Sequence, residues 1–291
     1  MIELKDVVYC RLGTRDLAAA EGFATGVLGL EVAHRRPGAV YFKSDLREHT
    51  LCYFDGDPAS QIVAFELGST CDLDRAAQIL ETLGHPIAYG ARAECDARSV
   101  AAFVAFRDPS GNAIELVVRP ATTGRRYLGA RDAGITGFSH VGLYTTDPER
   151  DERFWTTVCN ARVSDRIGDA PLMRLRTIHH SIALFPFHKP GIQHINHQVG
   201  STDDIQRSAN FVRARNLNIT FGPGRHPTSS AQFLYFAGPD GMTFEYSTGV
   251  REIHDEPAWR DRQFQFAPPG FCQWGAKPKI AAFQEKPRDD T

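Results

Sequence analysis

The stretch RHPTSSAQFLYFAGPDGMTFEY runs from Arg225 to Tyr246 and predicts two strands joined by a tight turn. Aromatic and apolar residues fill FLYF and MTFEY, and the turn-forming sequence PDG at positions 239–241 separates them. Glu245 lies between Phe244 and Tyr246 in the second strand. A carboxylate in so apolar a strand is costly to bury unless a partner compensates it. The stretch therefore predicts a hairpin in which a metal ion is a candidate partner for Glu245.

Composition sets the outer limits on what the chain can be. Its 291 residues, 42% hydrophobic and 23% charged, are typical of a soluble globular protein with enough material for two domains. The net charge of −2 provides no basic field for nucleic acid or for an anionic membrane, and neither is expected as a partner. We expect no signal peptide in MIELKDVV and find no apolar run of about 18 residues that would span a bilayer. Six scattered cysteines without CxxC spacing indicate reduced thiols and a cytoplasmic location.

Residues 1–120 predict an N-terminal domain in which the order strand, helix, further strands occurs twice. The expected strands cover residues 7–12, 31–33, 39–42, 50–54, 61–67, 100–106 and 113–118. The first expected helix has Thr14 or Asp16 as its cap, and the second covers residues 72–84. A polar segment with glycine and arginine, residues 121–135, is interpreted as a linker.

Residues 136–250 predict a second domain with the same order of elements. Strands are expected over residues 138–144, 161–166, 171–176, 179–185 and 194–200, and helices over 147–160 and 201–216, followed by the hairpin. The tail, residues 251–291, is rich in aromatic residues and proline but shows no periodicity, so no regular element is expected there. Its aromatic residues predict that it packs over the domain or at a subunit contact, with the final EKPRDDT disordered.

The two halves form an internal repeat, and the repeat locates the chemistry. Three landmarks recur at offsets of 131, 132 and 130 residues: Tyr9 and His140, Ile62 and His194, and Glu115 and Glu245. Such a nearly constant offset indicates duplication. Only the second copy carries two histidines with the glutamate, so only the second half is expected to hold a metal in this way.

Two histidines and one carboxylate form the facial triad that suits non-haem Fe(II) and leaves positions open for substrate and oxygen. His140, His194 and Glu245 are separated by 54 and 51 residues, too far apart for one helix. The triad therefore requires three strands that present side chains to a common interior. A lone histidine in a strand is more often structural, and the repeat with its matched glutamate is what favours the metal site here.

The segments FSHVGLY, HHSIAL, QHINHQV, GRHPTSSAQFLYF and GPDGMTFEY resemble the type I extradiol ring-cleaving dioxygenases of the vicinal oxygen chelate superfamily. The resemblance extends to about residue 250 and is most specific between His140 and Tyr246. It implies an α+β fold of two tandem domains, each built of paired βαβββ modules (the vicinal oxygen chelate, or glyoxalase-like, fold). It also implies that His140, His194 and Glu245 bind Fe(II), with Mn(II) as the alternative metal.

The resemblance further assigns three residues beside the metal. It implies that His180 is an acid–base group next to oxygen and that His226 and Tyr235 hydrogen-bond the substrate. Histidine and a phenolic hydroxyl suit this chemistry, since the diol must lose a proton and a later intermediate must gain one; a pKa near neutrality is expected for the histidine. His179 should point to the opposite strand face, unless a register slip exchanges it with His180, and Tyr235 could instead be a packed aromatic. His197 is interpreted as a hydrogen-bonded core residue.

The function that follows from the resemblance is extradiol cleavage of a catechol-type ring with both atoms of O2, giving a hydroxy-semialdehyde or keto acid in aromatic catabolism. The expected partners are a catecholic diol, O2 and further copies of the chain in a homo-oligomer. A glyoxalase-like isomerase or hydrolase is one alternative, although it would typically use four ligands including a second glutamate. A metal-free binding protein is the other. The sequence leaves open which diol is cleaved.

Overall fold

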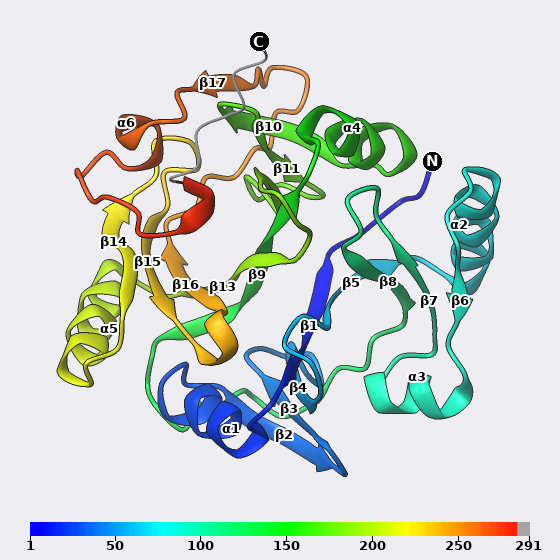
Figure 1. The fold of residues 1–291 in the computed structure, drawn as a ribbon, viewed down its shortest axis with the longest axis horizontal. Helices are drawn as coiled ribbons and strands as arrows, with labels where there is room; N and C mark the ends of the chain where they lie inside the picture. Colours follow the sequence, from blue (N-terminus) through cyan, green and yellow to red (C-terminus); the bar gives the residue numbers. More distant parts are fainter. Residues whose placement is uncertain (284–291) are drawn as a thin grey trace.

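Two β-sheets dominate the computed structural model, which describes residues 1–283, and the helices lie around their outside (Figure 1). The first sheet has eight strands in the order β2-β3-β4-β1-β5-β8-β7-β6, and the second has nine in the order β14-β15-β16-β13-β9-β12-β11-β10-β17. None of the helices in residues 1–283 has the length and apolar character needed to cross a membrane. The segment EKPRDDT, expected to be disordered, lies outside the described residues.

The first sheet and its helices occupy the N-terminal part of the chain. Its strands are β1 (Val7–Thr14), β2 (Glu31–Arg36), β3 (Ala39–Lys43), β4 (Leu51–Asp55), β5 (Gln61–Leu67), β6 (Ala88–Tyr89), β7 (Ala102–Arg107) and β8 (Ala113–Val118). Its helices are α1 (Leu17–Gly26), α2 (Thr70–Thr82) and α3 (Arg92–Arg98). β1 pairs with β4 in parallel and with β5 antiparallel, and β5 pairs with β8 in parallel.

The second sheet repeats this arrangement. Its strands are β9 (Ile135–Thr145), β10 (Arg162–Ile167), β11 (Ala170–Arg174), β12 (Ile182–Pro186), β13 (Ile192–Val199), β14 (Ile219–Arg225), β15 (Gln232–Ala237), β16 (Thr243–Thr248) and β17 (Arg262–Phe264). Its helical segments are α4 (Pro148–Arg153), η1 (Phe154–Val158), α5 (Thr202–Ala214), η2 (Pro239–Gly241), α6 (Pro268–Phe271) and η3 (Ala281–Phe283). β9 pairs with β12 in parallel and with β13 antiparallel, and β13 pairs with β16 in parallel. Each half is thus two βαβββ modules joined through their first strands, which confirms the predicted fold class.

Side-chain caps explain where the main helices begin. Asp16 accepts a hydrogen bond from the backbone of Ala19 at 2.9 Å and starts α1, which decides between the two predicted caps. Ser201 does the same for Asp204 at the start of α5, as its sequence pattern predicts. The helix expected over residues 147–160 is shorter, because α4 gives way to the π-helical turn η1 at Phe154.

Several elements are absent from the sequence-based prediction. The sequence of α3, RAECDAR, has only Cys95 buried and therefore no apolar periodicity to reveal it. β14, ITFGPGR, contains turn-forming glycine and proline, which an edge strand tolerates. β6 has two residues, and the tail contributes β17 and α6 although no regular element was expected there.

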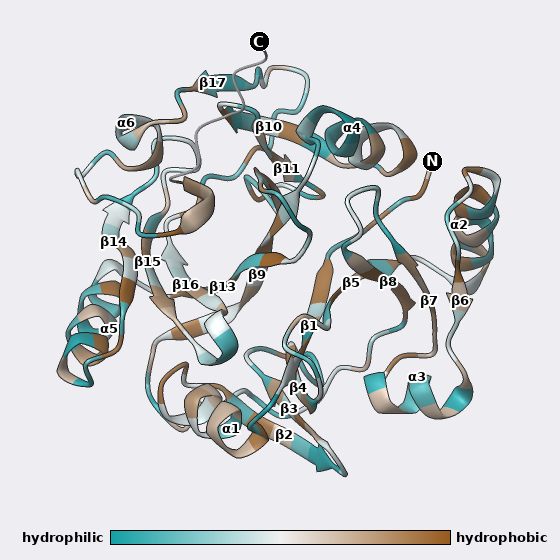
Figure 2. Ribbon diagram, in the orientation of Figure 1, coloured by the Kyte–Doolittle hydropathy of each residue, from teal (hydrophilic) through white to brown (hydrophobic). Residues whose placement is uncertain are grey.

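The two halves share one hydrophobic core, and stretches of hydrophobic residues lie along strands of both sheets, such as β1 and β9 (Figure 2). Trp155 in η1 is fully buried, and its ring centroid lies 5.3 Å from that of Phe65 on β5. Phe23 on α1 packs on Phe244 of the C-terminal hairpin at 5.4 Å. The N-terminal half therefore supports the back of the hairpin that carries Glu245.

Candidate metal centre

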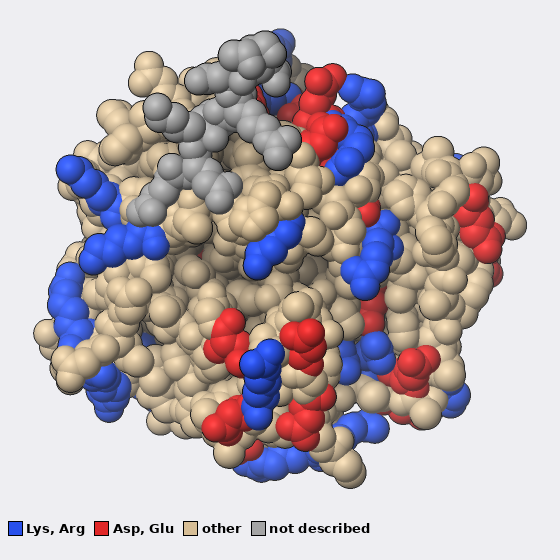
Figure 3. Space-filling model, viewed as in Figure 1, with Lys and Arg blue, Asp and Glu red and all other residues tan. Residues whose placement is uncertain are grey.

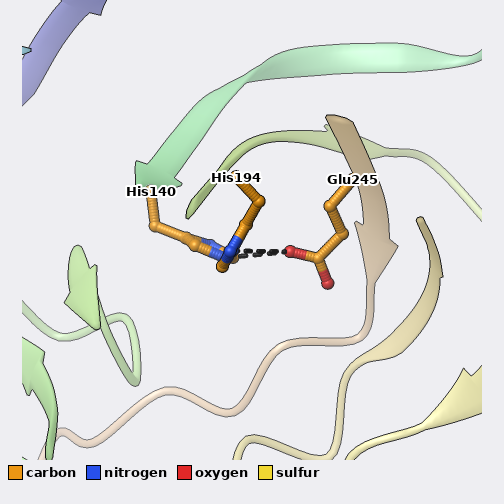
Figure 4. Close-up of side chains that lie close together, drawn as sticks. All are labelled: His140, His194 and Glu245. Atoms are coloured by element: carbon orange, nitrogen blue, oxygen red, sulfur yellow. Dashed lines mark hydrogen bonds and ion pairs between the residues drawn. The ribbon is translucent and has the colours of Figure 1, made fainter. Parts of the chain in front are cut away.

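Three adjacent strands of the second sheet bring His140, His194 and Glu245 together (Figure 4). His140 lies on β9, His194 on β13 and Glu245 on β16, and Asn196 of β13 is in register with both His140 and Glu245. The Nε2 atom of His140 is 3.1 Å from Nε2 of His194 and 3.0 Å from Oε2 of Glu245. Nε2 of His194 is 3.3 Å from the same oxygen. Three side chains that are far apart in sequence thus converge on one point.

The donor set and its geometry fit a metal ion. Ligand atoms about 2.1 Å from a metal and at right angles to each other are about 3.0 Å apart, whereas tetrahedral ligands are about 3.4 Å apart. The observed separations of 3.0, 3.1 and 3.3 Å agree better with one face of an octahedron. Both carboxylate oxygens of Glu245 are buried and lack an aligned hydrogen-bond donor within residues 1–283. A buried carboxylate without such a donor needs a compensating cation.

Local structure prepares His194 to act as a ligand. Its Nδ1 atom hydrogen-bonds the side-chain carbonyl oxygen of Gln193. Because that oxygen only accepts, the ring hydrogen is on Nδ1 and the lone pair of Nε2 points to His140 and Glu245. Gly142 lies opposite His194 on β9, and a Cβ atom at Gly142 would overlap the His194 ring. Glycine therefore leaves the room that the imidazole needs.

Electrostatics keep these groups in the protonation states of metal ligands. Burial alone would raise the pKa of Glu245, but the ring nitrogens of His140, His194 and His226 outweigh it and hold that pKa well below its usual range. Burial lowers the pKa of His140 to about 4, against the opposing effect of Glu245. A carboxylate and a neutral imidazole are the forms that bind metal.

The other predicted site residues surround the same point. The His180 ring centroid lies 4.1 Å from that of His140. Nε2 of His226 is 3.6 Å from Oε1 of Glu245 and 3.3 Å from the hydroxyl of Tyr235. Tyr235 is 3% exposed, and burial followed by the charge of Glu245 raises its pKa well above the usual range, so the phenol keeps its proton. All six predicted residues are therefore brought together.

His179 and His180 point to different partners, as expected, but they do not lie in a strand. The strand expected from His179 begins only at Ile182, so strand alternation does not orient them. His180 lies against His140, whereas Nε2 of His179 is 2.8 Å from Oδ2 of Asp165. The two rings are perpendicular, with an interplanar angle of 89°.

His197 is fully buried as predicted, but the expectation that it is hydrogen-bonded is wrong. Neither ring nitrogen has a hydrogen-bond partner among residues 1–283, and its ring packs near Phe138 with centroids 5.9 Å apart. Burial lowers its pKa to about 3. The side chain therefore behaves as a neutral, mainly space-filling group, and it lies outside the cluster of His140, His194 and Glu245.

The tail covers the site with apolar side chains. Phe271 and Phe283 pack on each other with ring centroids 4.9 Å apart. Phe283 also contacts Phe185 on β12 at 5.0 Å, and the centroid of Phe185 lies 6.1 Å from that of the His194 ring. These side chains belong to a separate hydrophobic cluster over the inner face of the second sheet.

The equivalent position in the N-terminal half is closed by protein side chains. Tyr9 donates a 2.6 Å hydrogen bond to Glu115, and Arg98 from α3 forms a 2.7 Å ion pair with the same carboxylate. A guanidinium thus balances Glu115, where the second half has two histidines beside Glu245. The one group of potential ligands found in residues 1–283 is His140, His194 and Glu245, as the repeat predicted.

Sequence analysis missed the groups that hydrogen-bond His179 and His226. Asp165 and Arg262 hydrogen-bond each other and connect to His179, and the carbonyl of Phe271 accepts from His226. Asp165 and Arg262 are 97 residues apart in positions that no motif marks, and a backbone carbonyl leaves no signal in side-chain identity.

Comparison with known proteins finds relatives that are similar over most of the chain. An iron-dependent extradiol dioxygenase from Rhodococcus jostii (strain RHA1) is 26% identical over 284 residues, covering 90% of this chain and 94% of the relative. The structure of homoprotocatechuate 2,3-dioxygenase from Arthrobacter globiformis matches with a TM-score of 0.85 at 22% identity, covering 98% of this chain and 92% of the other. A Mn(II)-bound glyoxalase from Novosphingobium aromaticivorans also matches with a TM-score of 0.85, at 24% identity and 98% and 95% coverage. The structural matches establish the fold, which proteins with different names share.

The profile of one family covers both halves of the chain. It is described as the Glyoxalase/Bleomycin resistance protein/Dioxygenase superfamily, and it matches residues 6–116 and 137–246. These two segments contain most of both sheets and all six residues of the candidate site. The chain therefore belongs to the Glyoxalase/Bleomycin resistance protein/Dioxygenase superfamily.

Proposed function

We propose that the chain is a metal-dependent extradiol dioxygenase that cleaves a catechol-type ring beside its hydroxyl groups and incorporates both atoms of O2. The observation that carries this proposal is the buried convergence of His140, His194 and Glu245, with ligand atoms 3.0–3.3 Å apart. The extradiol dioxygenase from Rhodococcus jostii, similar along nearly its whole length, supports it. The product would be a hydroxy-semialdehyde or a keto acid.

His140, His194 and Glu245 would hold Fe(II), the ion named for the Rhodococcus relative. Bound Fe(II) would bring the diol and dioxygen together and pass electron density between them. Mn(II) is the alternative, because sites that contain a carboxylate also suit it. Imidazoles bind a metal in their neutral form and glutamate binds it as a carboxylate, so this ligand set carries a charge of −1 and favours a divalent cation and a singly deprotonated diol.

The chain's other side chains would manage protons. Burial, with smaller contributions from neighbouring histidines, holds the pKa of His180 well below its usual range. The ring is therefore neutral, rather than close to its midpoint as expected from the sequence, and it can accept a proton from the diol. The protonated phenol of Tyr235 can donate a hydrogen bond to a substrate oxygen, and His226 lies within 3.3 Å of that hydroxyl.

The lining of the site favours an aromatic ring as substrate. Phe185 and Phe221 face the inner side of the sheet, and Phe271 and Phe283 of the tail cover them. Apolar walls with a few convergent polar groups are the usual form of a small-molecule site. We further propose that the tail shapes substrate access. Catechol, alkylcatechols, dihydroxybiphenyls, dihydroxynaphthalenes and hydroquinone-type diols are the set to screen.

The reaction can be tested directly. Purified protein is incubated with Fe(II) and catechol without oxygen and is then opened to air, while the visible spectrum is recorded. We expect a yellow ring-opened product and uptake of O2. Glu245→Gln should abolish both, whereas Glu115→Gln, the matched change in the N-terminal half, should retain the metal. Full turnover by Glu245→Gln would contradict the proposed triad.

The same preparation discriminates the alternatives. Turnover of methylglyoxal with glutathione, without oxygen uptake, would support a glyoxalase-like enzyme. Diol binding that a chelator leaves unchanged would support a metal-free binding protein. The glyoxalase-like reaction is not expected, because Glu115 is already engaged by Tyr9 and Arg98 and is not free to be the fourth ligand of a paired site. Metal-free binding is not expected, because His140, His194 and Glu245 converge on one point.

We also propose that the enzyme works in the cytoplasm, in the catabolism of aromatic compounds, as a homo-oligomer. All six cysteines are free thiols, which supports a reducing compartment. Leu46 and Leu128 are 63% and 66% exposed and line the same surface hollow, which supports burial against another copy. On the face shown in Figure 3, basic side chains lie along the left flank, and acidic and basic side chains are mixed along the lower edge and on the right. Light scattering coupled to size exclusion measures the oligomeric state.

A further inference from the structure

The tail is connected by hydrogen bonds to the inside of the second sheet. β17 is the edge strand of this sheet and pairs in parallel with β10, with Arg262 in register with Asp165 (Figure 1). The backbone nitrogen and Nε of Arg262 donate to Oδ1 of Asp165 at 2.9 and 3.0 Å, and Nη2 donates to Oδ2 at 2.6 Å. Nη2 also donates to the carbonyl of Thr228 at 2.6 Å. Asp165 has no exposed side-chain surface, and Arg262 compensates its charge.

The same carboxylate determines the tautomer of His179. Oδ2 of Asp165 is 2.8 Å from Nε2 of His179, and a carboxylate only accepts, so Nε2 carries the hydrogen. Burial lowers the pKa of His179 against the effect of Asp165, and the cations Arg262 and Arg251 lower it further. The ring is therefore neutral, and its Nδ1 atom has a lone pair.

That lone pair in turn determines the tautomer of His180. The two Nδ1 atoms of His179 and His180 are 3.1 Å apart. One of them must supply the hydrogen, and His179 has none there, so Nδ1 of His180 is the donor. A neutral ring with hydrogen on Nδ1 has its lone pair on Nε2. His180 is thus held as a base at Nε2, beside the His140 ring.

A second contact of the tail acts on His226. Nδ1 of His226 is 2.9 Å from the carbonyl oxygen of Phe271 at the end of α6. The carbonyl only accepts, so Nδ1 carries the hydrogen and Nε2 has the lone pair in the neutral ring. That atom lies 3.3 Å from the hydroxyl of Tyr235, whose single hydrogen can go to it while no substrate oxygen accepts that hydrogen.

We propose that the tail segment from Arg262 to Phe271 sets the tautomers of both outer histidines, His180 and His226, so that each presents an Nε2 lone pair to the site. Asp165 and His179 are positioning residues, because they act through His180. The tautomer assignment rests on these hydrogen bonds between neutral rings and their partners. Its kinetic consequence rests on the proposed dioxygenase function.

The tautomers can be measured without turnover. Full-length protein labelled with 15N, both metal-free and loaded with diamagnetic Zn2+, is studied by long-range 1H–15N correlation, which separates protonated from unprotonated ring nitrogens. We expect hydrogen on Nδ1 of His180 and His226 and on Nε2 of His179. Hydrogen on Nε2 of His180 in the wild-type protein would overturn the proposal, whatever the enzyme's activity.

Asp165→Asn provides the sharpest variant. The asparagine oxygen can still accept from Arg262, while its NH2 group donates to Nε2 of His179. His179 must then carry its hydrogen on Nδ1, and His180 must move its hydrogen to Nε2. Asp261→Asn is the matched control, because Asp261 is the sequence neighbour of Arg262 and pairs at the surface with Arg166. Unchanged tautomers in Asp165→Asn would overturn the relay.

Kinetics separate this role from a merely structural one. With its hydrogen on Nε2, His180 cannot accept a proton there, so kcat should fall about 10²–10⁴-fold, the usual contribution of general acid–base catalysis. KM for the diol and the metal content should change little, because the ring itself stays in place; an aspartate-to-asparagine change in the serine-protease triad acts in the same way. A higher KM with unchanged kcat would contradict the proposal. Wild-type protein with the expected tautomers but no ring cleavage would instead reject the proposed function.

Discussion

Tyr235 on β15 lies directly opposite Glu245 on β16 in the antiparallel ladder, so the phenol and the carboxylate are fixed on the same face of the sheet. The Tyr235 hydroxyl reaches Nε2 of His226 at 3.3 Å. The phenol, a donor to substrate, thus lies beside the side chains proposed to bind metal but is not one of that group. The consequence is that Tyr235 can be changed without loss of the metal.

For Tyr235→Phe we therefore expect unchanged Fe(II) content and a kcat lower by about 10²-fold, because one donor to charge that develops during the reaction is lost. Steady-state oxygen uptake and metal analysis of the same preparation measure both. The alternative that Tyr235 is only a packed aromatic predicts wild-type kcat, since Phe retains the ring contact with His194 at 5.2 Å.

Metal stoichiometry distinguishes the two halves of the repeat. The wild-type chain should bind one divalent ion. His194→Ala should bind none with measurable affinity, because only two of the three ligands remain. Ile62→His restores a histidine at the matching N-terminal position but should add no second ion, since Arg98 already neutralises Glu115. Plasma mass spectrometry after gel filtration gives the count, and two ions per chain in Ile62→His would contradict this account.

Some parts of the structure could be predicted from the sequence and others could not, for physical reasons. The hairpin from Phe233 to Tyr246 and the triad could be predicted, since strand periodicity and the repeat register are local or regularly spaced signals. β14 was missed because glycine and proline indicate turns unless the strand is known to be an edge. Asp165 and Arg262 could not be paired from sequence, because only the docking of the three-residue strand β17 brings them into register.

The Arg98–Glu115 pair should contribute substantially to the stability of the N-terminal half. Arg98 and Glu115 are 12% and 2% exposed, and breaking a buried pair costs about 3–5 kcal/mol because one charge is left uncompensated. Arg98→Met should therefore lower the free energy of unfolding by about that amount. Arg92→Met is the matched control on the same helix: its partner Asp96 is exposed, so we expect a loss below about 1 kcal/mol. Equal losses in the two variants, measured by urea unfolding, would contradict the assignment.

Buried neutral histidines should make the protein sensitive to acid. His49 is 3% exposed, and burial, followed by the charge of Arg11, lowers its pKa from 6.5 to about 3. A depressed histidine pKa means that the unfolded chain binds the proton more tightly. The stabilisation is therefore complete above pH 6.5 and is lost as pH falls toward 3, at about 1.4 kcal/mol per pH unit.

His49→Phe removes this one group while retaining a ring beside Tyr9, whose centroid is 4.9 Å from that of His49. The free energy of unfolding should then fall less steeply between pH 6.5 and about 4, by about 1.4 kcal/mol per pH unit relative to wild type. Denaturant unfolding at several pH values measures the two slopes. His254→Phe, the same replacement at the exposed surface, is the comparison variant. The slope is the decisive quantity, because a packing change at position 49 shifts stability equally at every pH, whereas loss of a buried titrating group changes only its dependence on pH.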